Sequence, residues 1–235
     1  MKKSNIITSN YRLAKDENMN RIFSLDNPVM AFMGKVADLI ILNFIAIIFS
    51  IPIFTIGASW TAMYYVTLKM VRKEESYMFK DFWHSFKENF KQATIIWLLV
   101  LLVVAIFVGD FFIIRMMPDM IPKALMIVLA IMAFIISCTI IFVFPVLSHF
   151  ENTIKNTIKN AFIISLINIP YTILFIILFV LPFILFFYFY QVLPAVVMLG
   201  FSAPAYFASL FWDRIFRKIE PKVESDEIEE AEEVE

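Results

Sequence analysis

Long apolar runs alternate with short polar connections along most of the chain. Four runs of at least 21 residues are clear, at 93–114, 124–147, 161–182 and 192–212. About 20 helical residues cross the hydrocarbon core of a bilayer, where every backbone polar group must be satisfied internally. None of these runs alternates apolar and polar residues as a barrel strand does. The pattern therefore predicts an all-α, polytopic transmembrane helical bundle.

The segment 29–71 allows more than one interpretation. It holds a strong apolar run at 29–50 and a weaker one at 55–71, separated by the break SIPIFTIG. One span followed by a loop gives five crossings in all, two helices give six, and a re-entrant hairpin is a third possibility. Six crossings place 18 of the 20 Lys and Arg residues on one side of the membrane, whereas five divide them 12 to 8. Because cytoplasmic loops are enriched in Lys and Arg, we expect about six membrane helices with both termini in the cytoplasm.

Polarity divides the chain into three regions. We expect a polar cytoplasmic N-terminal arm at 1–28, a transmembrane helical domain at 29–218 and an acidic, disordered cytoplasmic tail at 219–235. The arm contains no apolar run of signal-peptide length. Residues 1–219 carry a net charge of +7 and residues 220–235 one of −8. A block of like charge such as this tail is typically solvated and without fixed structure.

Composition narrows the class of protein further. The chain is 61% hydrophobic and 17% charged, with a mean hydropathy of +0.80, whereas a soluble domain is about 45–50% apolar and about 25% charged. The lipid bilayer is therefore its expected partner. Four scattered glycines, one cysteine and two histidines cannot supply a phosphate-binding loop, a disulfide or a thiolate metal cage. No motif of a hydrolase is visible, so we expect no enzymatic activity, no cofactor, no metal and no nucleic-acid partner.

An aromatic stripe follows the segment 76–92. Its five members fall at i, i+3, i+4, i+7 and i+11, and are Phe79, Phe82, Trp83, Phe86 and Phe90. Charged residues, mainly lysines, occupy the rest of this helix surface. An aromatic face opposite a basic face is typical of a helix lying in the headgroup region, so we predict an amphipathic interfacial helix here. The alternatives are a connecting helix packed beneath the bundle and, less favoured, an aromatic ligand site.

Two features qualify as candidate functional sites. The first is the break around Pro52, Thr55 and Gly57, where Pro52 removes a backbone donor and Gly57 loosens the chain. Carbonyl groups near residues 50–54 could therefore be left unpaired and line a site. A plain turn at the outer surface is the alternative. The second is Asp110, since an ionisable residue at mid-helix costs about 2.5–3.5 kcal/mol on insertion scales. A surface pair with Arg115 would explain it without a function, and a proton-linked or substrate-linked role is the other interpretation.

The segment 43–97 carries a family resemblance. The pattern Pro52-x-x-Thr55-x-Gly57 and the run FKDFWHSFKENFKQA that follows it resemble the YesL family, a group of bacterial multi-pass membrane proteins classed as domain of unknown function 624. The resemblance implies a location in the bacterial plasma membrane and no established activity. Because members are often encoded beside ABC-type carbohydrate importers, it also implies a non-enzymatic accessory or regulatory role in carbohydrate uptake, with importer permease or ATPase subunits as partners.

Two other functions stay open at this level. A weak internal similarity joins 86–98 to 154–166, in which six of 13 positions match. Duplications of this kind occur in transporters, so a self-sufficient small-molecule permease is one alternative. A structural membrane protein without a ligand is the other. Neither composition nor spacing indicates a sugar site.

Overall fold

The computed structural model describes residues 28–75, 77–116, 122–188, 191 and 193–219, so the predicted arm and acidic tail lie outside it almost entirely. Every regular element among these residues is a helix, which confirms the predicted all-α class. The elements are α2 (Pro28–Ser50), the 3₁₀ turn η1 (Ile53–Thr55), α3 (Ile56–Arg72), α4 (Met78–Met116), α5 (Lys123–His149), α6 (Ile154–Ile167), α7 (Ile169–Tyr188), α8 (Leu193–Leu199) and α9 (Ser202–Ile219).

The described residues hold three to five candidate membrane spans. Three helices, α2 from Met30 onward, α4 and α5, are long and apolar enough to cross a bilayer. Two more candidates exist only as bent pairs, α6 with α7 and α8 with α9. The sixth crossing expected from the sequence corresponds to α3, which has 17 residues and is not among these candidates. The prediction of a multi-pass membrane protein is thus confirmed, with fewer candidate spans than expected.

The two runs expected to form the last spans are bent rather than straight. The chain turns by 103° between α6 and α7 and by 49° between α8 and α9. Pro170, at the second position of α7, has no N–H to donate to the carbonyl four residues earlier, and its ring clashes with that carbonyl, so α6 cannot continue through it. At the second bend Gly200 allows a close approach of the backbone, because a Cβ atom there would clash with the Val196 carbonyl oxygen. Both residues lie inside segments of high average hydropathy, which is why hydropathy alone did not predict the bends.

Helix α3 occupies the centre of the fold. It packs against α2, α4, α5 and α9, and ten of its 17 residues are buried. Two of its hydroxyl groups bond to these neighbours: Ser59 Oγ donates to the Ala46 carbonyl at 2.8 Å, and Thr67 Oγ1 lies 2.8 Å from Ser209 Oγ. A helix enclosed by protein can carry such polar groups when each is paired. This enclosure explains the weak apolar signal at 55–71.

Helix α4 is one continuous element of 39 residues. At about 1.5 Å per residue it measures about 58 Å, roughly twice the hydrocarbon thickness of a bilayer. The interfacial helix predicted at 76–92 is therefore not a separate element but the first part of the same rod that continues into the span predicted at 93–114. Neither Gly nor Pro occurs between Met78 and Val108, so nothing in the sequence ends the helix there.

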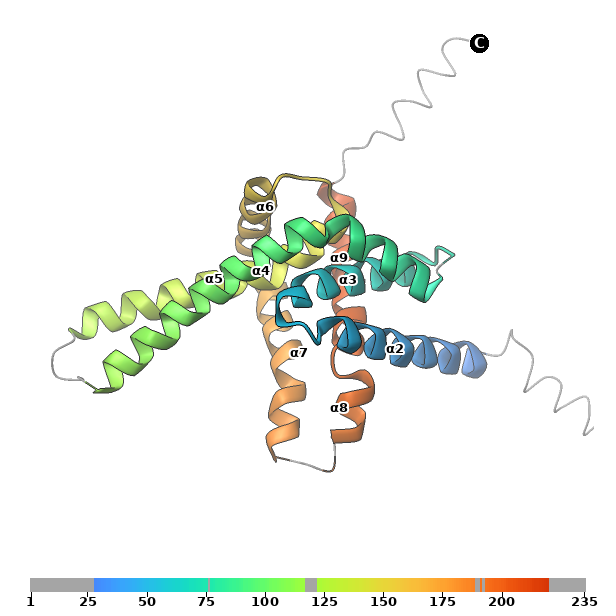
Figure 1. Cartoon of the computed structure of the whole chain (residues 1–235), viewed down its shortest axis with the longest axis horizontal. Helices are drawn as coiled ribbons and strands as arrows, with labels where there is room; N and C mark the ends of the chain where they lie inside the picture. Colours follow the sequence, from blue (N-terminus) through green and yellow to red (C-terminus); the bar gives the residue numbers. More distant parts are fainter. Residues whose placement is uncertain (1–27, 76, 117–121, 189–190, 192, 220–235) are drawn as a thin grey trace, which may run out of the picture.

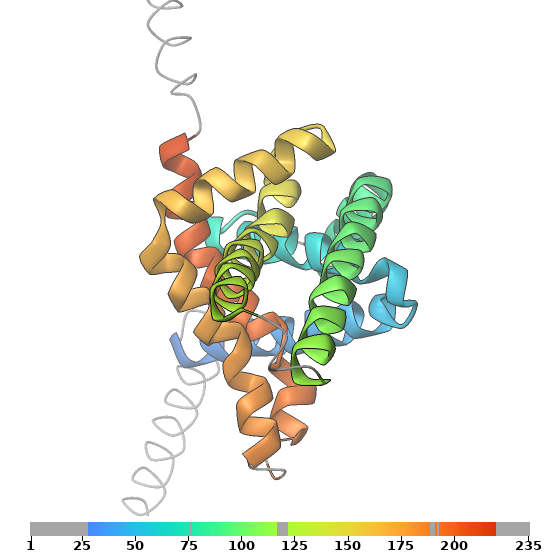
Figure 2. The same cartoon turned by 90° about the vertical axis from the view of Figure 1, so that its left-hand side faces the viewer.

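Two helical hairpins extend from the centre in different directions (Figures 1 and 2). The first joins α4 to α5, and the second joins α7 to α8. Large apolar side chains are exposed on both, among them Leu102, Ile131 and Ile177, each more than half accessible. Exposed apolar surface of this extent is expected where lipid is the solvent.

Candidate functional site

The break between α2 and α3 is a closed turn. The hydroxyl of Thr55 lies 2.6 Å from the carbonyl oxygen of Phe49 and 2.7 Å from that of Pro52, and the Thr55 N–H donates to the same Pro52 carbonyl at 2.9 Å. The indole N–H of Trp97 donates to the Ile53 carbonyl at 2.7 Å. The carbonyl groups of Phe49, Pro52 and Ile53 are thus paired within the chain, so these three do not present free acceptors to a ligand.

Gly57 brings α3 and α4 close together. A Cβ atom at this position would lie 2.6 Å from the Ala93 carbonyl oxygen, 2.7 Å from Trp97 Cβ and 3.0 Å from a ring carbon of Phe144. Two of these contacts are with α4 and one is with α5. The predicted Pro52–Gly57 motif therefore packs the start of α3 against α4 and α5. Thr55 closes the turn, the Trp97 bond holds it to α4, and Gly57 allows the close approach.

The aromatic stripe of α4 faces mostly protein. Phe82 and Phe86 are buried, Trp83 and Phe90 are partly buried, and Phe79 is 59% exposed. The ring of Phe49 from α2 lies within 5.1–5.4 Å of the rings of Phe82, Trp83 and Phe86. The stripe therefore fixes α4 against α2, which is the packing expected of a connecting helix beneath the bundle.

Asp110 lies near the far end of α4 and is half-buried. No ion pair or hydrogen bond joins it to Arg115 or to another residue that the structure describes. Five residues apart on a helix, the two side chains point about 140° away from each other, so the pair predicted from the sequence does not form. About 27 Å of helix separates Asp110 from Gln92, which borders the polar cavity described next.

A polar cavity of about 660 Å³ opens where α3, α4 and the α5–α6 connection meet. Amide, hydroxyl, imidazole and carboxylate groups make up most of its wall. The lining residues are Tyr65, Glu88, Asn89, Gln92, Leu147, Ser148, His149, Phe150, Glu151, Asn152, Thr153 and Asn156. Four further cavities in the described part of the chain have mainly apolar linings. This cavity is therefore the candidate functional site.

Hydroxyl and amide side chains line the cavity beside the carboxylates of Glu88 and Glu151 and the imidazole of His149. Ser148 donates its hydroxyl to the Pro145 carbonyl at 2.8 Å, and Asn89 donates to the Ser85 carbonyl at 3.1 Å. Gln92, Asn152 and Asn156 add three amide groups from two sides. Among the residues that the structure describes, no group of three or more His, Cys, Asp or Glu side chains could hold a metal ion.

A charged cluster forms the support behind one wall of the cavity. Arg72 of α3 donates to Asp213 of α9 at 2.7 Å, and Arg217 reaches the other carboxylate oxygen at 2.9 Å. Arg72 also lies 3.4 Å from His149, whose ring stacks on Phe216 with an angle of 3° between the planes. Through His149, the cluster connects the cavity to the packing of α3 against α9.

Replacing Asp213 with asparagine should weaken this support. The change removes the charge that attracts two arginines, and we expect the free energy of unfolding to fall by about 1–2 kcal/mol because the pair is only partly screened by solvent. Thermal unfolding of the purified chain in detergent measures the effect. Glu88→Gln is the matched control, since Glu88 contacts His84 at 3.6 Å with both side chains more than half exposed. Equal losses in the two variants would contradict a structural role for the Arg72–Asp213 pair.

The sequence pointed to some of these residues and missed others. The predicted motif at 52–57 and the aromatic stripe are present, but both serve packing. The cavity was missed because its residues come from three separate segments. The spacing of Asn152 and Asn156, four residues apart, was its one local signal. Asn43 was also missed, although its fully buried amide bonds three backbone groups at the α8–α9 bend.

Comparison with known proteins identifies a domain but no activity. No curated protein and no solved structure matches the chain. Residues 39–111 match the family described as "Protein of unknown function, DUF624". The matched region covers the second half of α2, all of α3 and most of α4, and it confirms the resemblance to the YesL family. The chain is thus a multi-pass membrane protein that carries a DUF624 domain at residues 39–111.

Proposed function

We propose that this protein is a non-enzymatic accessory component of a membrane transport complex, and that it binds a partner subunit through the polar cavity. The observation that carries the proposal is that amide and carboxylate groups from α4, from the α5–α6 connection and from the first turn of α6 surround one cavity, where a polar segment of another protein can reach them. Glu88, Glu151, Thr153 and Asn156 are exposed at this rim. Polar rims of this kind are usual at non-obligate protein interfaces.

The distribution of positive charge supports a cytoplasmic position for the cavity in the bacterial plasma membrane. Six Lys and Arg residues lie at 69–91, two at 148–160 and four after Trp212. The cavity is bordered by the first two of these segments, and the third approaches it through the Arg72–Asp213 contact. The positive-inside rule assigns connections of this kind to the cytoplasm.

The class of partner follows from the family resemblance and not from geometry. Relatives encoded beside ABC-type carbohydrate importers suggest the permease or ATPase subunits of such an importer. An accessory protein at the cytoplasmic face would meet the ATPase subunits and the cytoplasmic loops of the permease, both of which offer polar segments.

The alternative, a self-sufficient permease, has less support. In transporters, broken helices often leave backbone groups free to bind substrate. Here the α6–α7 bend is bonded internally, since Asn168 donates to the Ile164 carbonyl at 3.0 Å and Thr172 to the Ser165 carbonyl at 2.9 Å. The two similar segments also continue differently, because 86–98 lies within the unbroken α4 whereas 154–166 leads into a sharp bend.

Site-specific photo-crosslinking tests the accessory role. A photoreactive amino acid at Asn152, in the cavity, should crosslink to a permease or ATPase subunit of a co-produced carbohydrate importer. The same amino acid at Ile113, which is 56% exposed near the end of the α4–α5 hairpin, is the control and should label lipid. Filling the cavity with Asn156→Trp should reduce the Asn152 crosslink at least fivefold and lower sugar uptake by the cells.

Two results would contradict the proposal. One is an absence of importer crosslinks from Asn152 while the full-length chain is present in the membrane. The other is uptake of labelled sugar by liposomes that contain this chain alone, since an accessory protein has no transport activity of its own.

A further inference from the structure

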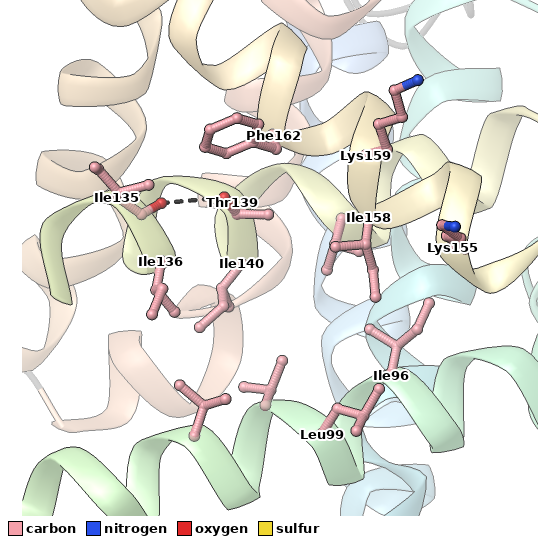
Figure 3. Close-up of a pocket in the computed structure, with 13 residues that line it drawn as sticks. Ile96, Leu99, Ile135, Ile136, Thr139, Ile140, Lys155, Ile158, Lys159 and Phe162 are labelled. Atoms are coloured by element: carbon pink, nitrogen blue, oxygen red, sulfur yellow. Dashed lines mark hydrogen bonds between the residues drawn. The ribbon is translucent and has the colours of Figure 1, made fainter. Parts of the chain in front are cut away.

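A second cavity, of about 480 Å³, lies between α4 and α5 and is covered at one end by α6 (Figure 3). Its walls are aliphatic, with Ile96 and Leu99 from α4 facing Ile136 and Ile140 from α5. The surrounding surface of the hairpin is also apolar and exposed, as at Leu102. The cavity therefore opens toward the lipid, and its volume is within the range of about 300–1,000 Å³ that is typical of ligand sites.

Polar groups occur at one end only. Thr139, the one hydroxyl in the lining, donates to the Ile135 carbonyl at 3.1 Å and is thus engaged within its own helix. The remaining polar groups are the ammonium groups of Lys155 and Lys159 on α6. They are four residues apart and so share one face of the helix. Neither forms an ion pair with a residue that the structure describes, and Figure 3 shows Lys159 extending away from the aliphatic wall.

An aliphatic channel that ends at two positive charges matches one class of ligand. A water-soluble anion would find no partner along the walls, and a neutral lipid would not use the lysines. Basic pockets between membrane helices bind anionic lipid headgroups. We propose that this cavity binds an anionic membrane phospholipid, with an acyl chain between α4 and α5 and the phosphate beside Lys155 and Lys159. The proposal is independent of the accessory role, because it involves a different cavity.

Lipid titration followed by native mass spectrometry tests the headgroup site. The full chain, purified in neutral detergent, is titrated with phosphatidylglycerol and with phosphatidylcholine of the same acyl composition. We expect phosphatidylglycerol to bind at least tenfold more tightly. One surface lysine contributes about a fivefold effect, so Lys155→Gln with Lys159→Gln should weaken phosphatidylglycerol binding about 25-fold and change phosphatidylcholine binding little. The control pair Lys80→Gln with Lys87→Gln removes equal charge from α4 and should have less than a twofold effect.

A second pair of variants tests the acyl-chain site. Val103→Trp should fill the channel and weaken the binding of both lipids at least fivefold, whereas Leu102→Trp, at the neighbouring exposed position, should not. Size-exclusion chromatography checks that each variant is folded. If Val103→Trp does not fold, the lysine variants still test the proposal. Equal affinity for the two lipids, equal losses in the two lysine pairs, or inorganic phosphate that displaces phosphatidylglycerol at an equal concentration would each overturn it.

Discussion

Replacing Gly57 with alanine is expected to destabilise the fold by about 3 kcal/mol, and replacing it with valine to prevent recovery of a folded monomer. The added Cβ would lie 2.6 Å from the Ala93 carbonyl oxygen, which is backbone and cannot turn away as a side chain can. Helices α3 and α4 would have to separate, and overpacking of this kind costs about 1–3 kcal/mol or more. Separation would also stretch the 2.7 Å bond between Trp97 and the Ile53 carbonyl.

Thermal unfolding of the detergent-purified chain measures this loss, and a second glycine supplies the control. Gly109 is also within a helix, but no atom outside its own helix backbone lies within 4 Å of the position its Cβ would take. Gly109→Ala should leave stability unchanged or raise it by up to about 1 kcal/mol, because alanine is the better helix former. Similar melting temperatures for the two alanine variants would show that α3 and α4 do not depend on this close approach.

Hydropathy predicted the elements that face lipid better than those that face protein. The runs at 93–114 and 124–147 are reproduced within α4 and α5, since lipid-exposed helices must be apolar on nearly every side. Helix α3 is surrounded by other helices, so its polarity follows its neighbours rather than the bilayer. The bends near Asn168 and Gly200 had local signals, but a sliding apolar window averages over a single residue.

The candidate site was less accessible to sequence analysis for a physical reason. Periodicity showed that the aromatic residues of α4 share one face, but it could not show that Phe49 covers that face. The polar cavity brings together Tyr65, Gln92 and Asn152. In the sequence the first two are 27 residues apart and the last two are 60 residues apart, so they follow no common spacing. Contacts of this kind arise only when α3, α4 and α5 pack together, so a local sequence pattern cannot predict them.

Among substitutions of a single polar side chain, replacement of Asn43 is expected to cause the largest loss of folding stability. This residue of α2 is fully buried, and its amide oxygen accepts hydrogen bonds from the backbone N–H groups of Phe201 at 3.0 Å and Ser202 at 2.9 Å. Its amide nitrogen donates to the Val197 carbonyl at 2.8 Å. One side chain thus bonds both sides of the α8–α9 bend, where the helix cannot satisfy its own backbone and lipid offers no hydrogen bonds.

Asn43→Ala should therefore lower the free energy of unfolding by about 3 kcal/mol, since a fully buried side chain loses three hydrogen bonds and a buried polar group without its partner costs about 1–3 kcal/mol. Protease sensitivity near Gly200 should rise in parallel, because α2 no longer holds the bend. Asn156→Ala, at an exposed amide, is the matched control and should change stability by less than about 0.5 kcal/mol. If Asn43→Ala unfolds at the wild-type temperature, the bend must be stabilised by the apolar contacts of α9 alone, and the buried amide would have no structural role.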